Sequence, residues 1–259
     1  MPKNSTDLPS TEQPVGRTIL GDGVVRVRAA RLGVAVVGDL VTAIVTGEVA
    51  PGDILPPESV LSQQFAVSRT VIRESVKRVE EKGLLTVSQG RGTIVNPPSM
   101  WNVLDPDVLS ALVDHDETLV VLDELAIVRG SLEATMARAA AGRQNPARTA
   151  ELTEAFERSV AYAEVDLAAY NAADAAFHDV VMEQSGIRLA ANITRIMFTR
   201  ARESRRFTGN TTDDAAHITL AEHRAVLEAI VAGDGDTAAT AMRDHIANAW
   251  ARRRAPGVA

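Results

Sequence analysis

The strongest constraint on the fold is the absence of a convincing strand pattern between residues 118 and 253. Apolar residues recur there at the spacing of helices, in long runs that are separated by polar and glycine-containing breaks. The breaks lie at Gly142–Pro146, Glu164–Asp166, Gly186, Gly209–Thr212 and Gly233–Gly235. They leave about six helices of roughly 11–25 residues, and short connections favour antiparallel neighbours. The segment therefore predicts an antiparallel all-α helical bundle.

The N-terminal segment combines three helices with a hairpin. Leucine, valine and isoleucine recur every four residues over 32–46, which predicts a helix that a glycine ends. A turn rich in proline and glycine follows, and then two helices are expected at 57–65 and 69–82. Two β-rich runs at 84–87 and 93–95 flank a turn with two glycines, which predicts a hairpin. This order is that of a winged helix-turn-helix, so the expected fold class is mainly α.

Domain boundaries follow from composition. The first 20 residues are polar with three prolines, and we expect a disordered tail over 1–30. The winged helix-turn-helix should span 31–97 and end where Asn96-Pro97-Pro98 interrupts regular structure. We expect a linker with short helical character over 98–117 and the all-helical domain over 118–253.

Residue composition indicates a cytoplasmic protein that makes no use of a membrane. The chain has no cysteine, which excludes disulfides and thiolate metal sites and is compatible with the cytosol. No apolar run approaches the roughly 20 residues that a membrane-spanning helix needs. The first 20 residues also lack the apolar core of a signal peptide.

Charge is unevenly distributed along the chain, whose net charge is -7. Residues 26–95 carry nine Lys and Arg against seven Asp and Glu, whereas residues 96–259 carry sixteen against twenty-four. An acidic second domain would keep non-specific affinity for DNA low, because attraction to phosphates dominates that affinity. The small basic excess in the first segment is also within ordinary scatter, so charge alone does not identify a partner.

The predicted helix 69–82 has a basic N-terminal end. Arg69 and Arg73 lie four residues apart on one side, and Thr70 and the expected N-cap Ser68 lie at the same end. A recognition helix directs such residues toward the major groove, where arginine can bind guanine and hydroxyls can bind phosphates. A solvated helix face would show the same arginine spacing, so the pattern alone leaves both interpretations open.

The stretch around this helix resembles the N-terminal domain of the GntR family of transcription regulators. The matching pieces are Gly47, Pro51-Gly52, Leu55-Pro56, Glu58, Val67-Ser68-Arg69, Arg73-Glu74, Gly83-Leu84 and Gly90-Arg91-Gly92. The resemblance implies that Arg69 and Arg73 contact operator DNA and that the wing contributes Gln89, Gly90 and Arg91. The family often has an arginine directly after its Leu-Pro-x-Glu motif. Ser59 stands there in this chain, which implies that one DNA contact is missing or weakened.

Three histidines and an aspartate are candidate metal ligands. Asp174 and His178 lie four residues apart and share a helix face, and His223 and His245 each lie eleven residues from Asp234, the centre of a turn. In an antiparallel hairpin those two histidines lie at similar height, so the four side chains can converge. Imidazole and carboxylate without thiolate suit Zn²⁺, Ni²⁺, Mn²⁺ or Fe²⁺. Three unrelated histidines with ordinary hydrogen bonds remain the alternative.

Residues 118–252 resemble the FCD ligand domain of the FadR subfamily of GntR regulators. The matching pieces are IVRGSLE (127–133), DAAFH (174–178), EHRAVLEAI (222–230) and MRDHI (242–246). The resemblance implies that Asp174, His178, His223 and His245 bind a divalent metal. It also places Arg129 toward the effector pocket, although a helix salt bridge with Glu133 would explain that arginine as well.

The expected function is that of a DNA-binding repressor that is not an enzyme. The segment 101–109 resembles the one found in galactonate-type sugar-acid repressors of this subfamily. A sugar acid offers a carboxylate and an adjacent hydroxyl, which chelate a metal well. The resemblance thus implies a homodimer on double-stranded operator DNA, controlled by a sugar acid or similar small hydroxycarboxylate at the metal.

Three other functions fit part of the sequence. The metal itself could be the signal, which would make the protein a metal sensor. A metalloenzyme would leave the DNA-binding segment unexplained, and the sequence has no paired Glu-x-x-His motifs of the di-iron type. A DNA-packaging protein is disfavoured by the weak basicity of the first segment and the acidity of the second.

Overall fold

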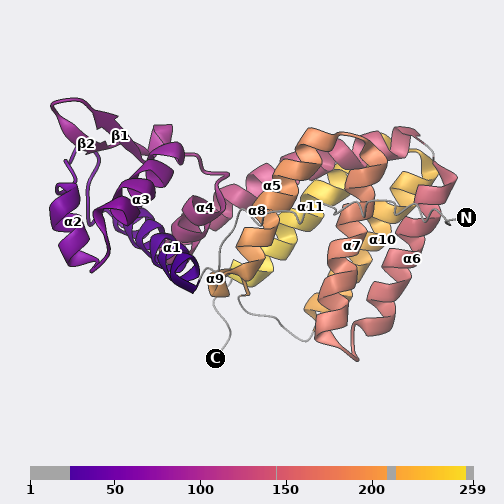
Figure 1. The fold of residues 1–259 in the computed structure, drawn as a ribbon. Helices are drawn as coiled ribbons and strands as arrows, with labels where there is room; N and C mark the ends of the chain where they lie inside the picture. Colours follow the sequence, from indigo (N-terminus) through magenta and orange to yellow (C-terminus); the bar gives the residue numbers. More distant parts are fainter. Residues whose placement is uncertain (1–23, 144, 209–213, 255–259) are drawn as a thin grey trace, which may run out of the picture.

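The computed structural model describes residues 24–143, 145–208 and 214–254. These residues form an N-terminal head, which holds the one sheet found in them, and a C-terminal bundle of helices (Figure 1). The expected fold class, a winged helix-turn-helix followed by a helical bundle, is therefore confirmed. No helix in the described part of the chain combines the length and apolar character that crossing a membrane would require.

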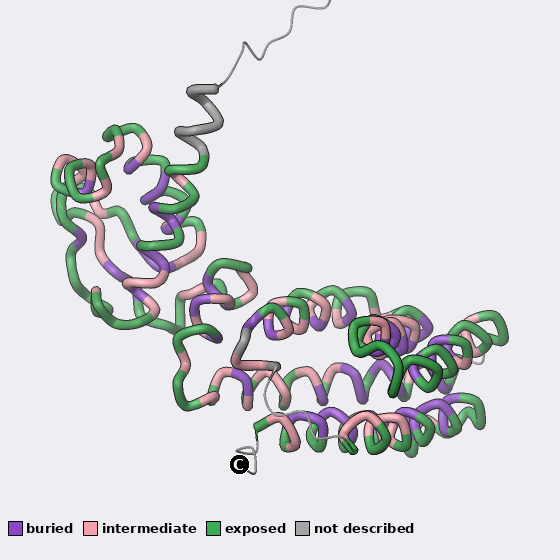
Figure 2. The backbone as a smooth tube through the Cα atoms, turned by 90° about the horizontal axis from the view of Figure 1, so that it is seen from below, coloured by how far each residue is buried: buried purple, intermediate pink, exposed green. Residues whose placement is uncertain are grey.

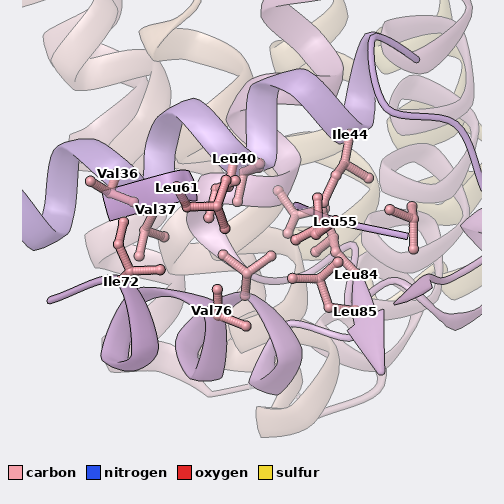
Figure 3. Packing of buried hydrophobic residues seen from close by; sticks show 14 of the residues in the cluster. Val36, Val37, Leu40, Ile44, Leu55, Leu61, Ile72, Val76, Leu84 and Leu85 are labelled. Atoms are coloured by element: carbon pink, nitrogen blue, oxygen red, sulfur yellow. The ribbon is translucent and has the colours of Figure 1, made fainter. Parts of the chain in front are cut away.

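The head consists of three helices and a hairpin. Their bounds are Val24–Val45 (α1), Glu58–Gln64 (α2), Arg69–Glu81 (α3), Leu85–Ser88 (β1) and Gly92–Val95 (β2). The strands are antiparallel, with Leu85 opposite Val95. The apolar stripe of α1 packs against α3 and the hairpin and forms the core of the head (Figure 3). Members of this core are Val36, Val37, Leu40, Ile44, Leu55, Leu61, Ile72, Val76, Leu84 and Leu85.

The expected disordered tail over 1–30 is wrong in its last part. Helix α1 begins at Val24, so residues 24–30 are helical, while residues 1–23 lie outside the described chain. The segment 24–32 contains neither proline nor glycine, and its alanines and arginines are good helix formers. No residue therefore stops α1 from extending toward the N-terminus.

The expected linker over 98–117 is a folded part of both units. A 3-10 turn at Pro98–Met100 precedes the helix α4 (Pro106–His115), which Asp105 caps by accepting hydrogen bonds from the first helical N–H groups. The predicted helical character is present, but the segment is not a free connection. One side of α4 joins the head core through Val108 and Ala111, and the other side packs on the bundle (Figure 1).

A partly buried lysine connects α4 to the end of α3. The Lys82 Nζ lies 2.7 Å from Asp105 Oδ1 and 2.8 Å from Asp107 Oδ2. The carbonyl of Lys82 also accepts a hydrogen bond from the N–H of Asn102. Because Asp105 is at the same time the cap of α4, a displacement of α4 is transmitted directly to the C-terminal end of α3.

The bundle contains six long helices and one short one among the described residues. They are Val120–Arg143 (α5), Pro146–Tyr162 (α6), Leu167–Ser185 (α7), Arg188–Glu203 (α8), Arg205–Thr208 (α9), Ala215–Ala232 (α10) and Gly235–Arg254 (α11). Four of the five predicted breaks separate these helices, and the fifth, Gly209–Thr212, lies outside the described chain.

Alanines bring the bundle helices close together. Helix α5 packs along α11 and also contacts α7, α8 and α10. Figure 2 shows buried positions on the facing sides of these helices and exposed positions on their outer sides. Because alanine carries only a methyl group, facing backbones can approach closely, which explains how a chain with 3% aromatic residues fills this core. Alanines in this core are Ala137, Ala140, Ala141, Ala155, Ala229 and Ala238.

A candidate metal centre and a candidate DNA-binding surface

Three helices of the bundle bring the predicted histidines together. His178 lies on α7, His223 on α10 and His245 on α11, and each is at most 3% exposed. The Nε2 atom of His245 lies 3.1 Å from that of His223 and 3.3 Å from that of His178. The two later histidines meet because α10 and α11 are antiparallel around the left-handed Gly233. One ion could therefore contact all three rings.

Asp174 lies at the edge of this cluster. It stands one turn before His178 on α7, and its Oδ1 is 3.8 Å from the Nε2 of His223. Burial would raise the pKa of Asp174, but its attraction to the protonated forms of His223, His178 and His245 outweighs this and holds the pKa below its ordinary value. The aspartate is therefore an ionised carboxylate beside the three rings.

Two carboxylates behind the cluster orient two of the rings. The Nδ1 of His178 lies 2.5 Å from Glu133 Oε2, and the Nδ1 of His245 lies 2.9 Å from Glu222 Oε2. We assign the ring proton to Nδ1 in both, because an ionised carboxylate can only accept a hydrogen bond. Each Nε2 then carries a lone pair that points into the cluster. Carboxylates orient metal-binding histidines in this way in many proteins.

Protonation favours the same arrangement. Burial lowers the pKa of His223 well below its ordinary value and also lowers that of His245, so both rings are neutral near pH 7. Burial opposes ionisation of Glu222, but Arg252 and His245 lower its pKa to about 2. Likewise Arg129 and His178 hold the pKa of the buried Glu133 far below its usual range. Metal ligation requires such neutral imidazoles.

His223 differs from the other two histidines. Its ring stacks on Phe177 at 4.2 Å, and its buried Nδ1 has no hydrogen-bond partner among the described residues. The ring proton of His223 can therefore reside on Nδ1, while the Nε2 atom faces the cluster. Three imidazoles and one carboxylate form a donor set that fits a divalent ion such as Zn²⁺, Ni²⁺, Mn²⁺ or Fe²⁺.

The surroundings of Arg129 are compatible with both interpretations of this residue, the helix salt bridge and the contact with an effector. Its Nε lies 2.6 Å from Glu133 Oε1, which is the expected helix salt bridge. Its guanidinium lies over the Phe198 ring at 3.6 Å, and its buried Nη2 has no partner among the described residues. Arg129 also lines a small cavity of about 30 Å³ together with Trp250 and Arg253.

Two contacts behind the cluster, one of Glu133 and one of Glu222, were not predicted from the sequence. The sequence predicts Glu133 as the salt-bridge partner of Arg129, four residues away. In the structure Glu133 also contacts His178, which is 45 residues away. Glu222 directly precedes His223 in sequence but contacts His245, 23 residues away. The spacing of these residues gives no signal for either contact, because the fold alone brings them together.

All seven residues predicted to contact DNA are exposed on the head. They are Ser68, Arg69, Thr70 and Arg73 at the start of α3, and Gln89, Gly90 and Arg91 at the tip of the hairpin. Ser68 is the N-cap of α3, since its Oγ accepts a hydrogen bond from the N–H of Val71. Its hydroxyl proton is still available for a phosphate.

Glu58 on α2 orients one of the two arginines. The Nε and Nη2 atoms of Arg73 each lie 3.0 Å from a Glu58 carboxylate oxygen, while the Arg73 side chain stays 72% exposed. A paired contact of this kind restrains the guanidinium and leaves its other N–H groups for a ligand. Glu58 belongs to a motif of the family, but its contact with Arg73 was not predicted from the sequence.

Comparisons with known proteins agree with both parts of the structure. The model of "Bacterial regulatory proteins, gntR family" matches residues 32–95, and that of the FCD domain matches residues 124–248. The galactonate operon transcriptional repressor of Escherichia coli is 33% identical over 213 residues, which are 81% of this chain and 91% of that one. The regulator LutR of Bacillus subtilis is 26% identical over 79% of this chain and 93% of its own.

A solved structure shows the same fold. Lar, which controls the expression of the Listeria monocytogenes agr system, superposes with a TM-score of 0.55 at 16% identity, over 86% of this chain and 96% of Lar. The winged head, the helical bundle and the matched family models lead to one conclusion. This chain belongs to the GntR family and is a DNA-binding transcription regulator with an FCD domain.

Proposed function

We propose that this regulator is a repressor that a small hydroxycarboxylate, such as a sugar acid, releases from its operator by binding at a divalent metal. Asp174, His178, His223 and His245 would hold the metal. The observation that carries the proposal is the convergence of three buried imidazoles, in which the Nε2 of His245 lies 3.1 Å from that of His223 and 3.3 Å from that of His178. Two of these rings are oriented by carboxylates, as in many metal sites.

The class of effector is inferred from the relatives and the metal. The galactonate operon repressor of Escherichia coli is 33% identical to this chain. A bound divalent ion would offer open positions to a carboxylate and its neighbouring hydroxyl. The unpartnered Nη2 of Arg129 is a further donor for an anionic oxygen near the site. These features together favour a small hydroxylated acid.

Helix α4 is the proposed mechanical connection between the two domains. Its Leu109 and Val113 pack on Met197 and Trp250, which also line the cavity beside Arg129. Its other end is tied to α3 through Lys82. In the proposed homodimer, a shift of α4 in each subunit would change the spacing of the two recognition helices on a near-palindromic operator. An effective switch needs a preference of about 5 kcal/mol for one state.

The test measures binding to the DNA fragment upstream of the protein's own gene by fluorescence anisotropy. We expect tight binding when the metal is present without acid and release only when metal and a sugar acid are both present. Chelation by EDTA should abolish the response to the acid. Release by metal alone would instead identify a metal sensor, and a protein that bound no such fragment would contradict the proposal.

The Arg73→Ala substitution should weaken operator binding by about 1–3 kcal/mol, because a base-contacting arginine contributes roughly this much. Arg78→Ala is a matched control, since Arg78 is also exposed but lies in the last turn of α3, away from its N-terminal end. Anisotropy titrations of both variants at one salt concentration compare them. Equal affinities of Arg73→Ala and the unmodified protein would remove Arg73 from the DNA-binding surface.

A further inference from the structure

A second cavity adjoins the candidate metal centre. It has a volume of about 260 Å³, and its wall includes Glu133, His178, Thr194 and Phe198. Phe198 also lines the smaller cavity beside Arg129. The volume is close to the lower end of small-molecule sites, about 300 Å³, and is larger than a two- or three-carbon acid needs.

Thr194 on α8 belongs to the wall of this cavity and carries a hydroxyl without a partner in the described protein. The residue is 1% exposed, and its Oγ1 has no hydrogen-bond partner among the described residues. Threonines in helices commonly donate to the carbonyl four residues earlier, as Thr153 does to Thr149 at 3.0 Å. Thr194 makes no such bond in the described chain. A buried hydroxyl without a partner is unfavourable, so its retention here points to a ligand that pairs with it.

Other buried or charged groups of the wall already have partners. Glu133 binds His178 and Arg129, and Arg195 pairs with Asp179 at 2.7 Å. Thr194 is therefore the buried group of this wall whose hydrogen-bonding capacity is not used by the described protein. A hydroxyl can donate and accept at once, and so a hydroxyl of the ligand is its natural partner.

We propose that Thr194 binds a hydroxyl of the effector beyond the carboxylate and α-hydroxyl that chelate the metal. The inference rests on the proposed function and specifies its effector class as a polyhydroxylated acid. An acid that lacks this hydroxyl leaves the buried Oγ1 unpaired, which is how a polar site rejects such analogues. Thr194 would thus select sugar acids over lactate, although both offer the same chelating pair.

The test is the Thr194→Val substitution, which removes the hydroxyl and keeps the branched shape. Calorimetry on the metal-loaded full-length protein measures affinity for D-galactonate, D-gluconate, D-mannonate and L-lactate. We expect the tightest sugar acid to bind roughly 10- to 100-fold more weakly to the variant, as the loss of a buried hydrogen bond implies, and lactate affinity to change less than about twofold. Thr240→Val is the matched control, because Thr240 is an exposed helical threonine on α11 and does not line this cavity.

Thermal unfolding without acid provides a second measurement. If the hydroxyl is unpaired in the protein alone, Thr194→Val should keep or raise the Tm, whereas a structural hydroxyl would lower it. A lowered Tm, or a sugar acid that binds both proteins equally, would overturn the role of Thr194. Tighter binding of lactate than of every sugar acid would overturn it while leaving the proposed function intact. If no acid binds the metal-loaded protein, both proposals fail.

Discussion

His223→Ala should remove most of the metal affinity and, with it, the response to acids. Variants of residues that only support a metal ligand typically lose 10- to 100-fold in affinity, so loss of a direct ligand should cost on the order of 100-fold or more. Metal should also stabilise the unmodified protein, by about 2.7 kcal/mol at a concentration 100 times its Kd, and should not stabilise the variant. Mass spectrometry of dialysed protein measures the metal, and thermal unfolding with and without metal measures the stabilisation.

His217→Ala is the matched control for this prediction. His217 is also on α10, but its side chain is exposed and pairs only with Glu164 at 3.2 Å among the described residues. The control should keep full metal occupancy. Because alanine at 223 also removes the stacking on Phe177, His245→Gln repeats the test at a different ring. Full metal occupancy in both variants would refute the ligand assignment.

Gly83→Ala should destabilise the head by about 2–5 kcal/mol. Gly83 ends α3 with φ +81°, a left-handed conformation that costs other residues roughly 1–2 kcal/mol. A Cβ at this position would also overlap the backbone carbonyl of Met100, and overpacking adds about 1–3 kcal/mol. The backbone of Met100 cannot rotate away as a side chain can, so the chain around Gly83 or Met100 would have to shift. Urea denaturation gives the change in the free energy of unfolding.

The Gly47→Ala substitution separates the cost of the left-handed conformation from the cost of steric overlap. Gly47 has nearly the same conformation, φ +77°, but a Cβ there would have no neighbour within 4 Å. Its substitution should therefore cost only the conformational part, about 1–2 kcal/mol. The excess in Gly83→Ala then measures the close approach of the segment after the hairpin. Equal losses in the two variants would show that this contact is unimportant for stability.

Local sequence patterns were sufficient to predict most helices and the hairpin. Helix periodicity, the Ser68 cap and the glycines and prolines between segments depend on residues only a few positions apart. The helices α2 and α3 begin and end close to the predicted positions, whereas α1 begins eight residues earlier than predicted. The approach of His223 to His245 was also accessible, because a symmetric hairpin relates residues at equal distance from its turn. The GntR and FCD resemblances were confirmed by the comparisons.

Tertiary structure alone decided which side chains support the sites. The contacts of Glu133 with His178 and of Glu58 with Arg73 join residues on different helices. The burial of α4 between two cores and the unpaired hydroxyl of Thr194 likewise depend on neighbours from distant segments. Periodicity tells which face of a helix is buried, but the partner of that face is set by how all helices pack at once.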